Sequence, residues 1–270
     1  MAQSVLERIA EDGVIRAGTR ASGGVFSHET AGGGFEGFSV DLLKEIRLGM
    51  ERRLERDVEL KLFPVTPSDR LTRVADRELD IVCGLTTPTW EREQMIDFSL
   101  PFFRDGTRIM AYREHASRIA DVNKLEIGVV EGTTTVSVIA KHLPLVTVRT
   151  YANIGEAMNA LVKGDVQGIS NIGTVLLSEA ERVQLDKSVV LLPRTSVLAT
   201  EPLACILPQN DSPWRDFVNG IFVDLLAGIG SHASRYEEIY DRWFGRDGLL
   251  HFPIDRETRN YLANVSIWVQ

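Results

Sequence analysis

Hydrophobic positions follow two different periods along the chain, and segments with one period alternate with segments with the other. Between residues 39 and 56 apolar side chains recur every three or four positions, which is the spacing of one helix face. Between residues 58 and 62 they occupy every second position, which is typical of a strand. A strand, a helix, a strand and a helix in succession predict a parallel sheet covered by helices.

The same alternation predicts elements along the rest of the chain. We expect helices over residues 1–12, 39–56, 68–77, 136–142, 154–163, 213–228 and 231–243. We expect strands over residues 13–19, 58–62, 80–84, 126–130, 146–149, 166–170 and 203–207. Gly164 stands where the helix over 154–163 should end, and the Gly/Ser-rich segment 21–37 is expected to be irregular.

The alternation restarts after residue 110, and the last strand and helices follow Pro202. The chain therefore predicts an α/β protein with two lobes joined by two hinge strands. The first lobe is expected to be discontinuous, over residues 1–110 and 203–270, and the second to comprise residues 111–202.

Composition narrows the functional classes. The chain has 270 residues and a formal net charge of −8, which disfavours nucleic-acid binding and an anionic membrane surface. No apolar run approaches the length of a membrane span. The N-terminus lacks the apolar core of a signal peptide, so two interpretations stay open: an export signal has been removed, or the protein is intracellular.

The chain has two cysteines, Cys83 and Cys205, without metal-ligand spacing. They are either two buried small side chains or one bridge within a lobe, which requires an oxidising compartment. Because one ends the third expected strand and the other lies in the strand that returns to the first lobe, we expect them on neighbouring strands. The five histidines are scattered and predict no metal site.

Polar residues gather where the expected strands end, and ligands of open α/β sheets bind at those ends. The residues are Arg20, Arg70, Thr86, Thr87, Arg92, Thr133 and Thr134. Arginine offers a planar fork to a carboxylate, and threonine hydroxyls and N–H groups at a helix start favour anions. A lone loop arginine is more often a solvated surface charge, and Thr after Gly is more often a helix cap. Their shared position favours an anion site.

Several motifs resemble one family. The stretch GLTTPTWEREQMIDFSLP over residues 84–101 resembles the signature of bacterial extracellular solute-binding proteins of the polar amino-acid family. GVIRAGTR, GFSVDLL, VVEGTTT and YEEIYDRWFG resemble other motifs of that family, in the same order. The resemblance implies a type II periplasmic-binding-protein fold. Arg20, PVTPSDR and CGLTT are most similar to glutamate/aspartate-binding proteins.

The resemblance also implies roles for individual residues. Arg20 and Arg70 would hold a distal carboxylate of the ligand. Thr87 and Arg92 would hold its α-carboxylate from the first lobe, and Thr133 would do so from the second. The full set of candidate ligand-binding residues is Arg20, Arg70, Leu85, Thr86, Thr87, Arg92, Thr133, Thr134 and Ile172.

The chain departs from the family pattern in its second lobe. Ile172 stands where the family places an aspartate for the ligand's ammonium group. No Asp or Glu lies between Asp165 and Glu179. Ile154 and Val130 replace a histidine and a threonine. An ammonium group desolvated against isoleucine would lack a partner. We therefore expect a carboxylate that lacks the α-amine, or an amino acid whose amine is held by Asn171, Ser170 or a backbone carbonyl.

The sequence thus predicts a monomeric solute-binding receptor, periplasmic or extracellular, that closes over a small carboxylate or amino-acid-like ligand and delivers it to the membrane permease of an ABC transporter. We expect no cofactor, no metal, no nucleic acid and no catalysis. Two alternatives stay open. One is a dehydratase-like enzyme on the same scaffold, with Glu131 as its general acid. The other is the sensory domain of a receptor.

Overall fold

The computed structural model describes residues 3–185, 188–230 and 234–266, and the chain divides into two compact units. The first unit comprises the chain up to Phe103 and from Pro202 onward, and the second comprises Arg104–Glu201. The lobes were expected to change over after residues 110 and 202. The first change comes earlier because β7 (Phe103–Tyr112) pairs along its length with strands of the second sheet.

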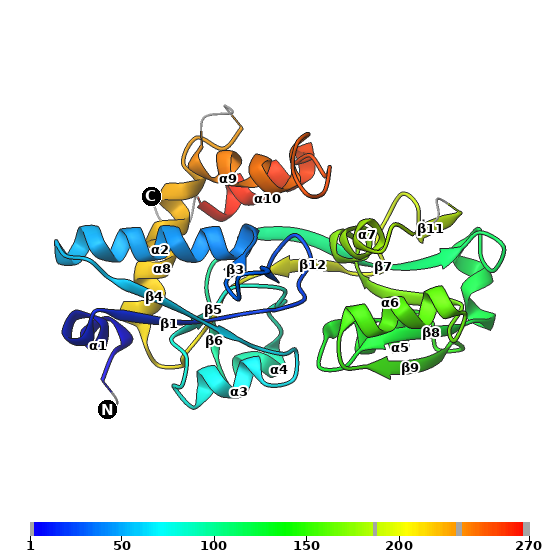
Figure 1. Cartoon of the computed structure of the whole chain (residues 1–270), viewed down its shortest axis with the longest axis horizontal. Coiled ribbons are helices and arrows are strands. Elements are labelled where there is room, and N and C mark those ends of the chain that lie inside the picture. The colour runs from blue at the N-terminus through cyan, green and yellow to red at the C-terminus, as the bar shows by residue number, and fades with distance from the viewer. Residues whose placement is uncertain (1–2, 186–187, 231–233, 267–270) are drawn as a thin grey trace. The chain divides into compact units, whose positions relative to one another are not determined.

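The first unit contains a five-stranded sheet in the order β4-β1-β5-β13-β6 (Figure 1). β1 runs parallel to β4 and β5, and β13 runs antiparallel to β5 and β6. The strands are β1 (Val14–Thr19), β4 (Glu59–Pro64), β5 (Ile81–Val82), β6 (Asp97–Phe98) and β13 (Ile206–Leu207). Because β1 and β5 are parallel neighbours, the segments that follow them leave the sheet at the same edge.

Four helices of the first unit begin at a residue whose side chain caps them, namely Ser4, Thr89, Asp211 and Ser234. Ser4 and Glu7 form a capping box at the start of the first helix, which buries Val5 and Ile9 as expected. Figure 1 shows α2 running alongside β4 and β1, against which it packs. The helices are α1 (Val5–Asp12), α2 (Phe38–Leu54), α3 (Arg70–Ala75), α4 (Trp90–Glu93), α8 (Ser212–Leu226), α9 (Arg235–Phe244) and α10 (Arg256–Ser266).

Aromatic side chains fill the core of the first unit. Phe38 contacts six other rings edge-on or tilted, among them Phe103, Tyr236 and Phe244. Buried indole N–H groups find partners: Trp214 donates to the Asp80 carbonyl at 2.8 Å. Trp243 likewise donates to the Asp41 carboxylate at 2.9 Å, so α8 and α9 are fixed to the remainder of the unit.

A disulfide joins Cys83 to Cys205, with Cα atoms 4.2 Å apart. Cys83 directly follows β5 and Cys205 directly precedes β13, and these two strands are paired. The expectation that the two cysteines lie on neighbouring strands is confirmed. The bridge fixes the returning chain to the sheet beside the segment that carries Thr86 and Thr87.

The second unit contains strands in the order β11-β7-β10-β8-β9, and β12 also pairs with β7. β8 runs parallel to β9 and β10, whereas β7 runs antiparallel to β10 and β11. The additional strands are β8 (Glu126–Val130), β9 (Thr147–Tyr151), β10 (Gly168–Ile172), β11 (Val189–Leu192) and β12 (Thr200–Leu203). β7 and β12 are the two strands by which the chain passes between the units.

The helical segments of the second unit are η1 (Ile119–Lys124), α5 (Thr134–His142), α6 (Ile154–Lys163) and α7 (Gly173–Arg182). α6 has the expected bounds: the Asn153 side chain caps its start, and Gly164 ends it with a φ of 78°. α5 and α6 pack against β8 and β10. Apolar residues of β7, β8 and β11 form the core, including Ile109, Ile127 and Leu192.

Three expectations need correction. The segment 21–37 is not wholly irregular, because β2 (His28–Glu29) and β3 (Phe35–Glu36) pair and Phe26 is buried in the aromatic core. The single strand expected over 203–207 is two strands, since β12 pairs with β7 and β13 joins the first sheet. The helix expected over 231–243 begins at Arg235, and residues 231–233 lie outside the described part. Among the described helices none is long and apolar enough to cross a bilayer.

Candidate functional site

Three arginines of the first unit belong to segments at the ends of its strands. Arg20 directly follows β1, Arg70 begins α3 after β4, and Arg92 lies in α4 after β5. Arg20 and Arg70 are 6% and 1% exposed, and Arg92 is half-buried. Arginine is rarely buried without a function or a partner that needs it there.

Arg70 is held in a fixed orientation. Its Nε donates to the Thr86 hydroxyl at 2.9 Å, and its Nη1 donates to the Pro67 carbonyl. Thr86 is fully buried, its N–H donates to the Gly84 carbonyl, and its carbonyl accepts from the Ala204 N–H at 3.0 Å. The guanidinium is thus oriented by the loop after β5, which the disulfide anchors.

The electrostatics of this arginine group are unfavourable. Burial and then the positive charges of Arg92 and Arg20 together lower the pKa of Arg70 from its ordinary value to about 9, against a small opposing effect of Asp69. The three cations are therefore close enough to repel one another where water screens them poorly. A bound anion would relieve that repulsion, so the arrangement is suited to a carboxylate.

The loop after β5 supplies further polar groups. Arg92 Nη1 donates to the Thr87 carbonyl at 2.7 Å, which places these two residues next to each other. Thr89 caps α4 by accepting from the Arg92 N–H at 3.2 Å. Leu85 and Thr87 are half-buried, whereas Trp90 is 89% exposed and therefore not part of the core.

The second unit places Thr133 and Thr134 at the start of α5. Thr133 is the N-cap residue, and its hydroxyl donates to the Val130 carbonyl at 2.6 Å. The Thr134 hydroxyl donates to the Glu201 carboxylate, at 3.1 Å and 3.0 Å from its two oxygens. Glu131, the general-acid candidate, is exposed and lies two positions before the N-cap residue.

Glu201 was not predicted from the sequence. It is 2% exposed, and its carboxylate also accepts from the Thr107 hydroxyl at 2.8 Å. A glutamate in the apolar stretch that follows residue 200 was the only available signal. The carboxylate of Glu201 therefore lies beside Thr134. The sequence had indicated only an anion-binding role for this threonine loop.

The residues expected to replace the amine site are apolar and buried in the structure. Val130 and Ile154 are each 1% exposed, and Ile172 is 6% exposed at the start of α7. The Ser170 hydroxyl donates to the Arg108 carbonyl at 2.8 Å, and Asn171 Oδ1 accepts from the Ile172 N–H.

A second carboxylate missed by sequence reasoning lies at the start of α7. Asp105, from β7, accepts hydrogen bonds from the Thr174 N–H at 2.8 Å, from the Thr174 hydroxyl and from the Gly106 N–H. Burial raises the pKa of Asp105, and the hydrogen bonds and Arg108 oppose that rise. A carboxylate therefore reaches α7 from a strand far away in sequence, and it caps the helix.

The predicted residues thus form two groups. Those of the first unit lie in segments that follow its strands and are linked by hydrogen bonds and mutual repulsion: Arg20, Arg70, Leu85, Thr86, Thr87 and Arg92. Those of the second unit lie at the starts of α5 and α7: Thr133, Thr134 and Ile172. Within the described residues no group of three or more His, Cys, Asp or Glu is arranged to hold a metal ion.

Comparison with known proteins identifies relatives over most of the chain. The family described as "Bacterial extracellular solute-binding proteins, family 3" matches residues 15–246. A "Glutamate/aspartate import solute-binding protein" of Escherichia coli (strain K12) is 23% identical over 252 residues, covering 90% of this chain and 80% of the relative. A "Cyclohexadienyl dehydratase" of Pseudomonas aeruginosa is 30% identical over 126 residues, which are 46% of this chain and 44% of the relative.

Solved structures share the fold. The crystal structure of an ancestral amino acid-binding protein, titled a precursor of cyclohexadienyl dehydratase, superposes with a TM-score of 0.75. It is 26% identical and covers 90% of this chain and 100% of its own. These neighbours are type II periplasmic amino-acid-binding proteins, which confirms the expected fold class of two α/β lobes joined by two hinge strands.

Proposed function

Because the chain belongs to family 3 of the bacterial extracellular solute-binding proteins, we propose that it binds a small carboxylate or amino-acid-like solute and delivers it to the membrane permease of an ABC importer. The observation that carries this proposal is the group formed by Arg20, Arg70 and Arg92. Folding brings three guanidinium groups together and lowers the pKa of the most buried one to about 9. Such an arrangement is unfavourable unless an anion is bound for part of the functional cycle.

Each residue of the first unit has a distinct role in this proposal. Arg92 and Thr87 bind one carboxylate, with the guanidinium as a bidentate donor. Arg20 and Arg70 bind a second anionic group, and Thr86 orients Arg70. Leu85 contacts the apolar part of the ligand. In the second unit, N–H groups at the start of α5, where Thr133 and Thr134 lie, contribute further contacts.

Closure of the two units over the ligand follows from the same proposal, since a ligand with contacts in both units stabilises the state in which both are made. Small-angle scattering with and without ligand tests it. We expect a smaller radius of gyration on saturation, and an unchanged radius would contradict the closure step.

The ligand class follows from the second unit. An ammonium group beside Ile172 would lie against an apolar, buried side chain. Two carboxylates of this unit, those of Asp105 and Glu201, already accept hydrogen bonds from N–H and hydroxyl donors of the protein. We therefore propose a carboxylate without the α-amine, dicarboxylates included, as the preferred ligand.

Titration calorimetry of glutarate against glutamate tests the ligand class. The two molecules differ only in the amine, so we expect glutarate to bind more tightly. If glutamate bound tenfold more tightly instead, equivalent to about 1.4 kcal/mol, the amine would have a partner and the assignment of Ile172 would be wrong.

The anion site itself is tested by Arg92→Ala. Loss of a desolvated charge-assisted pair should weaken binding of the best carboxylate by about 2–5 kcal/mol. Arg73→Ala is the matched control, because Arg73 is an arginine of the same unit that pairs with Glu78 instead. A loss smaller than threefold in the Arg92 variant would mean that the carboxylate is bound elsewhere.

Export to the periplasm or the cell surface is part of the proposal. The Cys83–Cys205 bridge supports it, because disulfides persist in oxidising compartments. The permease partner and a monomeric state are inferred from the family and are tested by reconstituted transport and by sedimentation, respectively.

An enzyme is the second candidate, because the chain is 30% identical to a cyclohexadienyl dehydratase over part of its length. Glu131, the acid expected from the sequence, is exposed, which is unsuited to a general acid whose pKa must be raised. We expect no turnover of a cyclohexadienyl carboxylate by the wild-type protein. Turnover that is lost in Glu131→Gln would replace the receptor proposal by the enzyme.

A further inference from the structure

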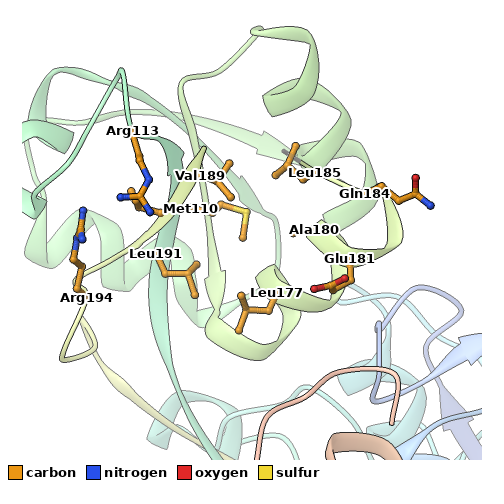
Figure 2. A pocket seen from close by; sticks show the side chains of 11 residues that line it. Met110, Arg113, Leu177, Ala180, Glu181, Gln184, Leu185, Val189, Leu191 and Arg194 are labelled. Atoms are coloured by element: carbon orange, nitrogen blue, oxygen red, sulfur yellow. The ribbon is translucent and has the colours of Figure 1, made fainter. Parts of the chain in front are cut away.

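The second unit has a cavity of about 640 Å³ between α7 and the outer strands of its sheet. Figure 2 shows its side chains: apolar groups of Met110, Leu177, Leu185 and Leu191 lie in the middle. Arg113 and Arg194 lie on one side, and Glu181 and Gln184 lie on the other. None of these residues belongs to the candidate site described above.

The apolar floor follows from strand alternation at the edge of the sheet. In β11, Val190 and Leu192 face the core and are 6% and 1% exposed. Val189 and Leu191 face the opposite way, are half-buried and line the cavity. Because β11 is the end strand of the sheet, no further strand extends the floor on its outer side.

The cavity residues extend along β7 and β11 and are distinct from the proposed ligand residues. β7 and β10 are antiparallel, with Thr107 opposite Ile172 and Ala111 opposite Gly168. Arg113 follows β7 at the end away from Ile172, whereas Arg194 is near Arg108, whose Nη1 donates to the Arg194 carbonyl at 3.3 Å. No residue that lines the cavity is one of those proposed to bind the carboxylate, so the two sites share no side chain.

The charge of the cavity is opposite to that of the protein. The chain has a net charge of −8, yet the charged residues that line the cavity are two arginines and one glutamate. Both arginines are exposed. Within the described residues, neither guanidinium makes a side-chain hydrogen bond or ion pair. Both therefore keep their donors available for an external anion.

We propose that this cavity is a second binding site, specific for a small amphipathic monocarboxylate: one carboxylate on Arg113 and Arg194, and a ring or branched chain on the apolar floor. The cavity volume falls within the range of about 300–1,000 Å³ that is typical of small-molecule sites. Glu181 on the opposite side disfavours a second negative charge, which distinguishes this site from the arginine group of the first unit. Inorganic anions fit poorly, because the floor is apolar.

The test uses the whole chain and 4-phenylbutyrate, with neutral 4-phenylbutanol as the matched probe. We expect calorimetry to show saturable binding of 4-phenylbutyrate and at least tenfold weaker binding of the alcohol, since the alcohol cannot pair with the arginines. In the double variant Arg113→Gln/Arg194→Gln, the Kd of 4-phenylbutyrate should rise at least tenfold. Both substituted residues are exposed, so the fold should be retained.

Three further variants complete the design. Ala180→Phe places a ring in the cavity from α7 and should abolish binding without loss of Tm. Arg182→Gln, an exposed arginine of the same helix that pairs with Glu179, should bind 4-phenylbutyrate like the wild type. Arg92→Ala should also bind it normally, although it loses the carboxylate ligand of the proposed receptor function.

The outcomes separate the possibilities. Binding that survives Arg92→Ala and is lost in the double variant and in Ala180→Phe supports the second site. Binding that is lost in Arg92→Ala and kept in the double variant would place the probe in the first unit and overturn the proposal. No binding up to about 10 mM, or equal affinity for acid and alcohol, would also overturn it.

Discussion

Replacing Arg70 by methionine should separate ligand binding from stability. The pKa of Arg70 falls from its ordinary value to about 9 on folding, chiefly through burial. Since one pKa unit corresponds to about 1.4 kcal/mol, folding disfavours its charged form by roughly 5 kcal/mol. Its two hydrogen bonds, to the Thr86 hydroxyl and the Pro67 carbonyl, offset about 3–6 kcal/mol. The two contributions nearly cancel, so the ligand-free protein should tolerate the substitution.

We therefore expect Arg70→Met to change the ligand-free free energy of unfolding by less than about 2 kcal/mol, well below the usual cost of about 3–5 kcal/mol for removing a partner from a buried pair. Binding of the best dicarboxylate should weaken at least a hundredfold, about 2.7 kcal/mol. Urea unfolding with and without ligand measures the first quantity, and calorimetry measures the second. Arg73→Met on the same helix is the control and should affect neither strongly.

The stability difference between wild type and Arg70→Met should change with pH in a defined direction. Because the folded-state pKa of Arg70 lies below its unfolded value, the penalty is fully present below about pH 9 and is relieved as pH rises toward 12.5. Wild type should therefore gain stability relative to Arg70→Met as pH increases above 9. Two results would refute the reasoning that the arginines repel one another. One is destabilisation of the ligand-free variant by more than about 3 kcal/mol, and the other is a loss of wild-type stability relative to Arg70→Met as pH increases above 9.

Two further predictions concern stability. Replacing Cys83 and Cys205 by serine opens a loop with a sequence separation of 122 residues, which should cost about 3–5 kcal/mol in urea unfolding, and a reducing agent should then have no additional effect on the variant. Asp105→Asn removes the carboxylate that caps α7 and should lower the free energy of unfolding by about 1–2 kcal/mol at neutral pH. Because the folded-state pKa of Asp105 is raised above 3.8, wild type should gain stability relative to the variant as pH falls through that raised pKa toward 3.8; a loss in that interval would contradict the direction of the shift.

Much of the first unit was predictable because its signals are local. The heptad-like spacing from Val40 onward predicts α2, and the alternation over 58–62 predicts β4. The order of strands and helices predicts parallel strands, and β1 is parallel to β4 and β5, although β13 and β7 pair antiparallel with their neighbours. Residues at the carboxyl ends of parallel strands share one edge. Arg20, Arg70 and Thr86 could therefore be named before their contacts were known.

Other parts of the site depend on contacts between segments distant in sequence. Asp105 contacts Thr174, and Glu201 contacts Thr134 and Thr107. These contacts form only because β12 pairs with β7 and β7 pairs with β10 in the second sheet. No local pattern indicates such a pairing. The sequence alone shows an isoleucine at position 172 and no acid nearby, whereas folding adds two buried carboxylates to the same unit.

The sequence by itself determined the fold class, the family and the residue types of the anion site, because these follow from periodicity, caps and short motifs. Only the tertiary structure decided which charges meet. Burial of Arg70 beside two other arginines, the Cys83–Cys205 bridge and the cavity between α7 and β11 all arise from long-range packing. Desolvation and charge repulsion depend on three-dimensional distance, and distance in space is what a linear pattern does not contain.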